Sequence, residues 1–492
     1  KNLLIIPSRW GIFFPETTGM TPRFPATLQG GGIMKITVLN GSPKGDTSVT
    51  MQYIRYARKL YPDNTCHIHD ISRGIKVIEK DPGAFRAVLE DVRSSELVIW
   101  AFPLYYLLVP SQYKRFIELV FERKGAAAFR SKYAAVITTS IHFFDHTAHN
   151  YMRAICDDLA MKFAGSYSAA MYDLVRSRER KRFDDFLACL FDTMRDNTPA
   201  ARAYYPVSAR MSPYRPSPPK NRINPEGKNI VIITDASSPS SNLGRMADRL
   251  RQSFTEEPPA YNLHDLKIKG GCLGCLQCAY DNRCVYGDSD DFHLFFESRI
   301  KAADIIFYCM ETRDRHLSSL WKRFIDRSFY NNHTPVLEGK QVGCLVSGQL
   351  GKLSSFNEFL RAFPEFQHAN LVDIVTDEGG NSKELDLQIQ NLACNAVARA
   401  EKNYIGPPTF LSVGGWKIFR DEIWGWLRFP FLADHRYYRK HGMYDFPKRR
   451  FAQSLVNGAL SQLVRLPGFR DVVYKQRMKE EMLRPFKAIL KL

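Results

Sequence analysis

The stretch MKITVLNGSPKGDTSVT, residues 34–50, decides the fold of this chain. Residues 36–39 are a short apolar run typical of a buried strand, and residues 49–60 carry apolar side chains at helical spacing. Small and polar residues join the two. A strand, a polar turn and a helix in this order predict the first unit of a parallel sheet whose two faces are covered by helices.

The same plan recurs later in the chain. Residues 230–233 and 245–254 repeat the strand and the helix, and KRFI at 114–117 recurs at 322–325, an offset of 208. That offset also aligns the strand-like runs at 96–100 and 304–308. Upstream, Ser42-Pro43 matches Ser238-Pro239 at an offset of 196. We therefore predict an α/β chain built by tandem duplication of one doubly wound domain.

Composition sets the predicted boundaries. Residues 1–33 precede the first strand-like pattern, and we expect them to be an untranslated or disordered leader; a signal peptide is disfavoured because prolines and a charge interrupt any apolar core. Residues 34–204 and 229–404 form the two domains, and the proline-rich residues 205–228 link them. Residues 405–492 form a basic, aromatic, helical appendage.

The overall composition is that of a globular protein. Of 492 residues, 45% are hydrophobic and 24% charged, and no apolar run approaches the roughly 18–20 residues that would span a bilayer. Six of the ten cysteines are scattered, mostly in apolar stretches, which indicates a reducing cytoplasm.

The appendage carries much of the net charge of +18, with 17 Lys and Arg against 7 Asp and Glu. Helical spacing at 451–464 and 472–489 predicts amphipathic helices. These could cover the second domain, dock an acidic electron carrier such as ferredoxin, or contact an anionic membrane surface. No nucleic-acid-binding motif accompanies the basic residues, so we expect no specific nucleic-acid partner.

Four cysteines lie close together as C-x2-C-x2-C-x5-C, at Cys272, Cys275, Cys278 and Cys284. Four thiolates in one short loop are typical ligands of a [4Fe-4S] cluster, although zinc, a redox dithiol or an empty structural loop are alternatives. In the first domain the corresponding loop is missing, and residues 72–77 stand in its place.

The turn after each first strand has the composition of a phosphate site, with hydroxyl side chains and a helix N-terminus. The candidate ligands are Ser42, Lys44, Thr47, Ser48 and Thr50 in the first domain and Ser238, Ser240, Ser241 and Asn242 in the second. A simple N-terminal helix cap is the alternative. The nucleotide P-loop and the dinucleotide fingerprint are both missing.

Gly41-Ser42-Pro43, Phe102-Pro103-Leu104-Tyr105-Tyr106 and Lys114-Arg115-Phe116 resemble the flavodoxin-like NAD(P)H-dependent FMN reductase family. With its cysteine loop, the second half resembles the iron-sulfur flavoprotein branch of that family. The resemblance extends from about Met34 to Tyr404. It implies two flavodoxin-like domains, with FMN at the carboxyl ends of the strands.

The resemblance also implies which residues contact the flavin ring. Pro103, Leu104, Tyr105 and Tyr106 would lie on one side of the ring, and Thr138, Thr139 and Ser140 on the other. Packing within the protein is the alternative role for Tyr105 and Tyr106. His142 and Asp145 are candidates for a proton donor, with a metal site as the weaker alternative for the histidine-rich segment. The second domain has Glu311-Thr312-Arg313-Asp314 instead, so we predict one FMN per chain, with two as the alternative.

We therefore predict a cytoplasmic flavin-dependent oxidoreductase that passes electrons between a donor, FMN and a [4Fe-4S] cluster within an internal pseudo-dimer. The donor would be NAD(P)H or a protein such as ferredoxin; whether the chain also forms a homodimer is open. The first alternative is an NAD(P)H-dependent FMN, quinone or nitro-compound reductase without a functional cluster. The second is a non-enzymatic redox sensor or nucleic-acid-binding protein.

Overall fold

The computed structural model describes residues 33–207, 211–446 and 451–477. Residues 1–32 of the predicted leader, and the predicted helix beyond Arg477, lie outside the described residues. The chain divides into two compact units between Tyr437 and Tyr438, and both α/β domains belong to the first unit.

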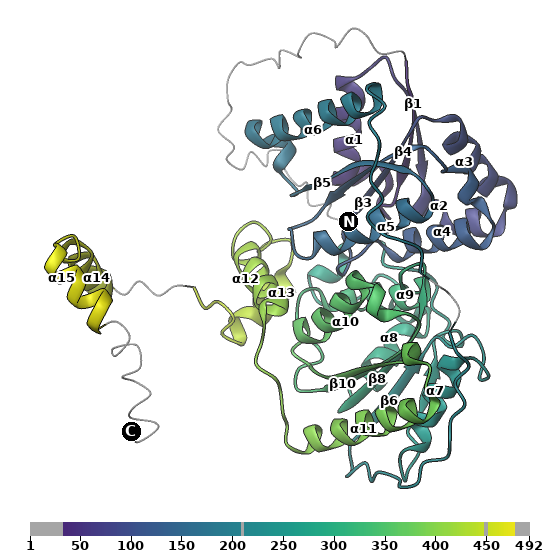
Figure 1. Cartoon of the computed structure of the whole chain (residues 1–492), viewed down its shortest axis with the longest axis vertical. Coiled ribbons are helices and arrows are strands. Elements are labelled where there is room, and N and C mark those ends of the chain that lie inside the picture. Colours follow the sequence, from purple (N-terminus) through teal and green to yellow (C-terminus); the bar gives the residue numbers. More distant parts are fainter. Residues whose placement is uncertain (1–32, 208–210, 447–450, 478–492) are drawn as a thin grey trace, which may run out of the picture. The chain divides into compact units, whose positions relative to one another are not determined.

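The first domain is a five-stranded parallel sheet with strand order β2-β1-β3-β4-β5 (Figure 1). The apolar side chains of the strands point alternately to the two faces of the sheet, where each face packs against a layer of helices. The strands are β1 (Lys35–Asn40), β2 (Thr65–Asp70), β3 (Leu97–Pro103), β4 (Tyr133–Thr139) and β5 (Lys162–Ala169). The helices are α1 (Val49–Leu60), α2 (Ile71–Lys80), α3 (Pro82–Ser94), α4 (Ser111–Glu122), α5 (Asp145–Asp158) and α6 (Ser177–Arg195).

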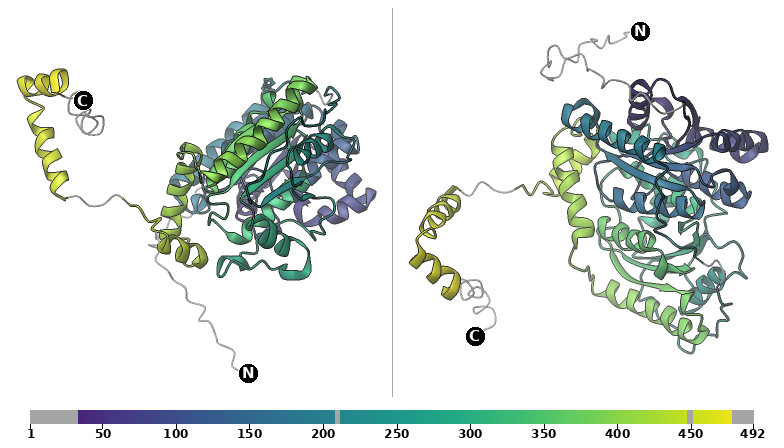
Figure 2. Two further views of the ribbon diagram at one scale, coloured as in Figure 1. Left: turned by 90° about the horizontal axis from the view of Figure 1, so that it is seen from below. Right: turned by 45° about the horizontal axis from the view of Figure 1, so that its top comes forward.

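The second domain has the same topology. Its parallel strands follow the order β7-β6-β8-β10-β11, and a short antiparallel strand, β9, pairs with the end of β8. The strands are β6 (Ile230–Thr234), β7 (Ala260–Asn262), β8 (Ile305–Arg313), β9 (His316–Leu317), β10 (Gln341–Ser347) and β11 (Asn370–Thr376). The helices are α7 (Asn242–Gln252), α8 (Phe292–Phe295), α9 (Ser319–Arg327), α10 (Ser354–Phe366) and α11 (Ser382–Glu401). The long helix α11, in green, lies beside the sheet in the turned views (Figure 2).

Both sheets therefore have the doubly wound, flavodoxin-like order that the sequence predicted. The offset that aligns the two KRFI segments also holds in space, because it carries the first residues of β3, β4 and β5 onto those of β8, β10 and β11. The first strands, β1 and β6, align at a smaller offset, since Ile36 pairs with Leu97 as Ile230 pairs with Ile305. The sequence offset between the serine-proline pairs that follow these strands is larger than the offset between the strands themselves. The turn after the first strand is therefore longer in the second domain.

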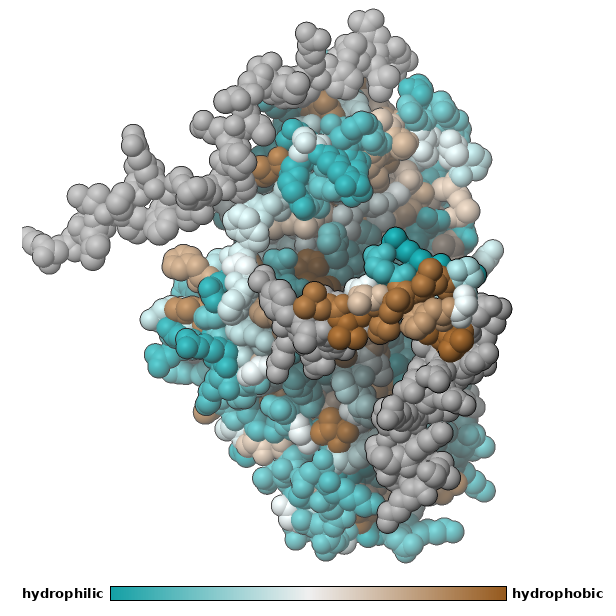
Figure 3. Space-filling model, turned by 90° about the vertical axis from the view of Figure 1, so that its left-hand side faces the viewer, coloured by the Kyte–Doolittle hydropathy of each residue, from teal (hydrophilic) through white to brown (hydrophobic). Residues whose placement is uncertain are grey.

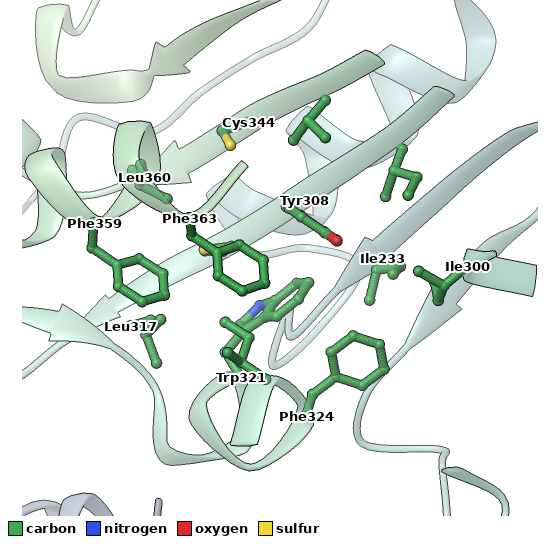
Figure 4. Close-up of a cluster of buried hydrophobic side chains, with 14 of the residues drawn as sticks. Ile233, Ile300, Tyr308, Leu317, Trp321, Phe324, Cys344, Phe359, Leu360 and Phe363 are labelled. Atoms are coloured by element: carbon green, nitrogen blue, oxygen red, sulfur yellow. The ribbon is translucent and has the colours of Figure 1, made fainter. Parts of the chain in front are cut away.

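A large apolar cluster fills the second domain between its sheet and helices α8, α9 and α10. Trp321 is fully buried and its indole N–H donates to the carbonyl of Cys309 at 3.2 Å, so this large side chain satisfies its polar atom. Tyr308, Phe324 and Phe363 surround it (Figure 4). Leu107 and Phe144 of the first domain join the same cluster, so the two domains share part of one core.

The C-terminal region is helical, with α12 (Phe410–Trp424), α13 (Leu432–Lys440), α14 (Phe451–Leu463) and α15 (Pro467–Asp471). Helix α12 packs against α10, so the division between the units falls later than the predicted start of the appendage at residue 405. Among the described residues, no helix has both the length and the apolar character that crossing a membrane requires.

Candidate functional site

The carboxyl ends of four neighbouring strands form one edge of the first sheet. Asn40 pairs with Ala101, and Thr139 pairs with both Pro103 and Ala169. The loops that follow β1, β3, β4 and β5 therefore meet at this edge. In doubly wound folds, ligands bind at such an edge where the strand order reverses, which is between β1 and β3 here.

The turn after β1 is held by its own side chains. The Ser42 N–H donates to Asn40 Oδ1 at 3.0 Å, and the Lys44 N–H donates to Ser42 Oγ at 3.2 Å. Ser48 caps helix α1 by accepting the Met51 N–H at 3.2 Å. This is the predicted helix cap, and it places the positive end of α1 at the turn.

The predicted phosphate ligands divide by burial. Ser42, Ser48 and Thr50 are buried, and Thr50 Oγ1 lies 2.6 Å from Thr139 Oγ1, whereas Thr47 is exposed. The buried hydroxyls therefore hold the turn and join it to β4. Contact with an anionic group would fall to the exposed Thr47 and to the backbone N–H groups at the helix start.

Arg73 on helix α2 is a candidate that sequence reasoning did not single out. Gly45 has a φ of +59°, and a Cβ added there would lie 2.5 Å from Arg73 Cδ and 2.8 Å from its Nη1. The guanidinium side chain therefore packs on the turn and brings a positive charge to it. Its presence in the segment that replaces the cysteine loop was the only signal in the sequence.

The loop after β4 carries the predicted proton donor His142, and Asp145 is the first residue of helix α5. His142 Nδ1 lies 2.9 Å from Asp145 Oδ2, and Ser168 Oγ donates to the same carboxylate oxygen at 2.6 Å. The hydrogen bond with Asp145 raises the pKa of His142. Burial opposes ionisation of Asp145, but its bonds with His142 and Ser168 outweigh burial and lower its pKa. The pair thus presents a protonatable, solvent-exposed imidazole oriented by a carboxylate.

The other residues predicted on this side of the flavin ring form hydrogen bonds within the first domain. Thr138 Oγ1 lies 2.7 Å from His149 Nε2, and burial lowers the pKa of that histidine. Ser140 Oγ accepts the His142 N–H at 2.9 Å. These bonds fix the course of the loop that leads from β4 to α5.

The predicted ring-binding loop after β3 turns sharply. The Leu104 N–H donates to the Thr139 carbonyl at 3.1 Å, and Tyr105 pairs with Leu108 across a tight bridge. Tyr106 and Leu107 adopt positive φ angles of 37° and 64°. Left-handed backbone at two consecutive non-glycine residues is uncommon and occurs mainly at functional or tightly constrained turns.

Tyr106 faces the second domain. Its ring makes edge contacts with Phe329 and Phe363, with centroids 5.9 and 5.8 Å apart, and its hydroxyl lies 3.5 Å from Ser328 Oγ. Burial raises its pKa. Of the two tyrosines predicted beside the flavin, Tyr106 therefore serves domain packing, which was the alternative that the sequence left open.

The four cysteines of the second domain line one small pocket. Its other walls include Arg327, Phe329 and Tyr330, and the cysteines are Cys272, Cys275, Cys278 and Cys284. All four are free thiols. Burial raises the pKa of Cys272 and of Cys278 to about 12. The donor set suits an iron-sulfur cluster by its chemistry. In the described ranges, however, no three His, Cys, Asp or Glu side chains are gathered as a metal site.

This cysteine loop lies against the candidate flavin site of the first domain. A Cβ added at Gly274 would lie 2.1 Å from Tyr105 Oη and 3.0 Å from Lys44 Cε, so the loop backbone touches both side chains. The Gln112 side-chain amide donates to the Cys272 carbonyl at 3.0 Å. Gly274 also has a φ of +62°. Only glycine accommodates this close approach with that backbone.

Lys44 is consequently placed differently from the prediction. Lys44 is exposed overall, and its side chain extends to the cysteine loop, with Cε against Gly274 and the charge near Cys272 and Cys275. Partial burial lowers the pKa of Lys44, and the two thiols oppose that effect. The positive charge assigned to the phosphate turn therefore lies between this turn and the cysteines.

Helices α4 and α9 join the domains through reciprocal bonds. The Ser111 N–H donates to Asp326 Oδ2 at 2.7 Å, and the Ser319 N–H donates to Glu118 Oε1 at 2.5 Å. Ser319 and Asp326 are the equivalents of Ser111 and Glu118 in the alignment of the two KRFI segments. Equivalent residues thus exchange equivalent contacts, as in a two-fold symmetric interface.

A buried lysine completes each half of this interface. Lys114 pairs with Glu118 at 3.3 Å, and Lys322 pairs with Asp326 in the same way; both lysines are fully buried. Buried charges are tolerated only when they are paired and hydrogen-bonded, so each lysine neutralises the carboxylate that accepts the serine N–H of the other helix.

The corresponding edge of the second sheet is acidic. By strand register, Asp235, Glu311 and Asp377 stand where the first domain has Gly41, Pro103 and Ala169. Burial raises the pKa of Asp235 to about 6; this carboxylate accepts from the Ser318 hydroxyl and the Glu311 N–H.

The predicted phosphate ligands of the second domain have partners within the chain. Asn242 donates to Asp377 and to the Ser212 carbonyl, both at 2.8 Å, and accepts the Tyr214 N–H. Ser241 caps α7, and the Ser238 and Ser240 hydroxyls lie 2.7 Å apart. The interdomain linker therefore crosses this turn.

Comparison with known proteins finds a family to which the first domain is similar. Residues 34–173 match the family model described as NADPH-dependent FMN reductase. This match covers most of the first domain and shows that the domain is similar to flavin-dependent oxidoreductases. A search of the curated proteins finds no match to the chain.

Solved structures of similar proteins align with about a third of the chain. FerB, an NAD(P)H:(acceptor) oxidoreductase from Paracoccus denitrificans, is 18% identical over 33% of this chain and 98% of its own, with a TM-score of 0.29. General stress protein 14 from Treponema denticola, in complex with FMN, is 14% identical over 32% and 99%, with a TM-score of 0.26. An NADPH-quinone reductase from P. pentosaceus is 15% identical over 32% and 96%, with a TM-score of 0.25.

Proposed function

We propose that the first domain binds FMN and uses it to reduce a small-molecule or protein acceptor with electrons from NAD(P)H or a carrier such as ferredoxin. The match of residues 34–173 to the FMN reductase family supports this activity. The geometry supports this edge of the first sheet as the binding site, since four strand ends and the N-terminus of α1 meet there.

The residues at this edge fit the parts of FMN. The turn at 42–48, the positive end of α1 and the Arg73 side chain would hold the phosphate. The segments 103–105 and 138–140 would flank the ring. FMN, when bound, supplies the electron and hydride transfer. His142, oriented by Asp145, would hold a proton at Nε2 for the reduced acceptor.

We further propose that the cysteine loop holds a [4Fe-4S] cluster that exchanges electrons with the flavin. The observation that carries this proposal is the contact of Gly274 with Tyr105 and Lys44, because it sets the four cysteines beside the flavin edge of the other domain. Cys272, Cys275, Cys278 and Cys284 would each provide one thiolate.

We infer one FMN per chain. A bound phosphate and flavin would meet the carboxylates of Asp235, Glu311 and Asp377 in the second domain, and the linker crosses its turn at Asn242. Like charges at close range disfavour an anionic ligand. The first domain would then provide the flavin and the second the cluster. The shared topology and the reciprocal contacts of α4 and α9 support an origin by tandem duplication of a domain that once paired with its own copy.

The test is anaerobic purification followed by quantification of iron, sulfide, zinc and FMN per chain. The proposal expects about four iron atoms and one FMN. Cys275→Ser should lose iron and keep FMN, whereas Cys189→Ser, at another exposed free cysteine, should keep both. Two FMN per chain would contradict the division between the domains.

A plain NAD(P)H-dependent FMN, quinone or nitro-compound reductase is an equally supported candidate. The family match covers the first domain alone, and the cysteines of the described chain are not gathered as a metal site. Purified protein with stoichiometric FMN, no iron and full NAD(P)H-dependent reductase activity would assign this function. A reducing cytoplasm remains the proposed location, because all ten cysteines are free. A redox-sensing or nucleic-acid-binding role rests on net charge only.

A further inference from the structure

Helix α14 exposes an unusual amount of apolar surface. Leu455 is 72% exposed, Val456 58%, Leu460 44% and Leu463 43%, and Leu466 just beyond the helix is 59% exposed. The spacing of the four helical residues places them on one side of α14. Soluble proteins rarely leave such a row of large aliphatic side chains in water without a binding partner.

The charge pattern around α14 is equally distinctive. The helix sequence FAQSLVNGALSQL contains no charged residue, whereas Lys448, Arg449 and Arg450 precede it and Arg465 and Arg470 follow. Residues 405–492 as a whole carry ten more basic than acidic residues. An apolar helix face with an uncharged polar side and basic flanks matches the interface of an anionic bilayer.

A second exposed apolar group lies in the preceding segment of the chain. Trp424, Trp426 and Phe429 are 48%, 60% and 86% exposed, and the Arg428 guanidinium lies 4.4 Å from the centre of the Trp424 ring. Tryptophan and arginine prefer the headgroup region of a membrane, where the ring is partly buried and the charge stays hydrated. Exposed hydrophobic residues on this side of the molecule are brown in the space-filling view (Figure 3).

We propose that the C-terminal region binds the surface of an anionic lipid bilayer, with α14 lying in the interface and Arg465 and Arg470, which follow it, contacting lipid headgroups. An acidic carrier protein would complement the positive charge, but it would not cover the exposed aliphatic side chains of the uncharged helix α14, which require an apolar partner. The lipid surface supplies both the charge and the apolar layer. This inference does not depend on the flavin or the cluster.

Vesicle co-sedimentation of the full chain tests the proposal. The protein should sediment with phosphatidylcholine vesicles that contain about 30% phosphatidylserine and stay in solution with phosphatidylcholine alone. Salt should weaken the binding, because counterions screen the headgroup charge. The double variant Leu455→Glu/Leu460→Glu should bind at least about tenfold more weakly.

Leu387→Glu is the matched control. Leu387 is 65% exposed on helix α11, so the same change removes an exposed leucine outside the C-terminal region, and the variant should bind as the unchanged protein does. Failure of the unchanged protein to bind anionic vesicles would overturn the proposal, as would equal binding by the double variant. Retention on an immobilised acidic ferredoxin without vesicle binding would assign the region to a protein partner instead, and would also overturn it.

Discussion

Removal of a carboxylate from the α4–α9 interface should strongly destabilise the protein. Asp326 is 1% exposed, accepts the Ser111 N–H and pairs with the fully buried Lys322. In Asp326→Ala, the lysine charge is left in the core without this carboxylate, and breaking such a pair costs about 3–5 kcal/mol. Glu118→Ala should cost about 3 kcal/mol, at the lower end of that range, because Lys114 keeps Asp314 at 3.6 Å and the Arg313 carbonyl at 3.0 Å.

Urea unfolding followed by circular dichroism measures these differences. Glu122→Ala is the control, since Glu122 is 41% exposed and pairs with Arg115 at the surface, where a salt bridge contributes about 0–1 kcal/mol. The double variant Lys322→Met/Asp326→Leu should recover part of the loss, because it removes the stranded charge. The reasoning fails if Asp326→Ala is no more destabilising than Glu122→Ala.

Two further predictions concern the edges of the two sheets. Gly274→Ala should destabilise the protein by about 1–3 kcal/mol more than Gly287→Ala. Both glycines have positive φ, but only the new methyl group at position 274 would clash with Tyr105 Oη. Thermal unfolding measures the difference, and the additional substitution Tyr105→Phe should relieve part of the cost. Burial raises the pKa of Asp235 from 3.8 to about 6, so the folded state binds its proton more tightly and stability should fall as the pH rises from about 4 to 6. Asp235→Asn should flatten this dependence and add up to about 3 kcal/mol at pH 7; unfolding free energies that keep the same pH slope would count against it.

Much of the fold could be predicted because local patterns carry it. The helix expected at 49–60 begins and ends at those residues, and the strands expected at 36–39 and 230–233 each lie within an observed strand. The repeat of the KRFI segment also predicted matching strands and helices in the two halves before any contact was known. Each of these follows from hydrophobic periodicity, which nearby residues determine.

The candidate site was only partly predictable. The sequence predicted the turn at 42–48, the loop at 103–106 and the four cysteines as candidate sites. It did not predict that the Lys44 side chain reaches the cysteine loop, and it left the role of Tyr106 open between flavin and packing. It also gave no particular role to Arg73, which packs on Gly45. These placements depend on contacts between residues far apart in the chain, which no local spacing encodes.

By itself, then, the sequence determined two doubly wound domains, a first half similar to flavin reductases and a cysteine loop in the second half, because composition and periodicity act over a few residues. Only the tertiary structure decided that the cysteine loop lies on Tyr105 and Lys44 of the other domain, and that acidic side chains stand at the second sheet edge. The physical reason is the packing of α4 against α9. The reciprocal hydrogen bonds from Ser111 to Asp326 and from Ser319 to Glu118 join the domains in one register, and that register brings distant loops together.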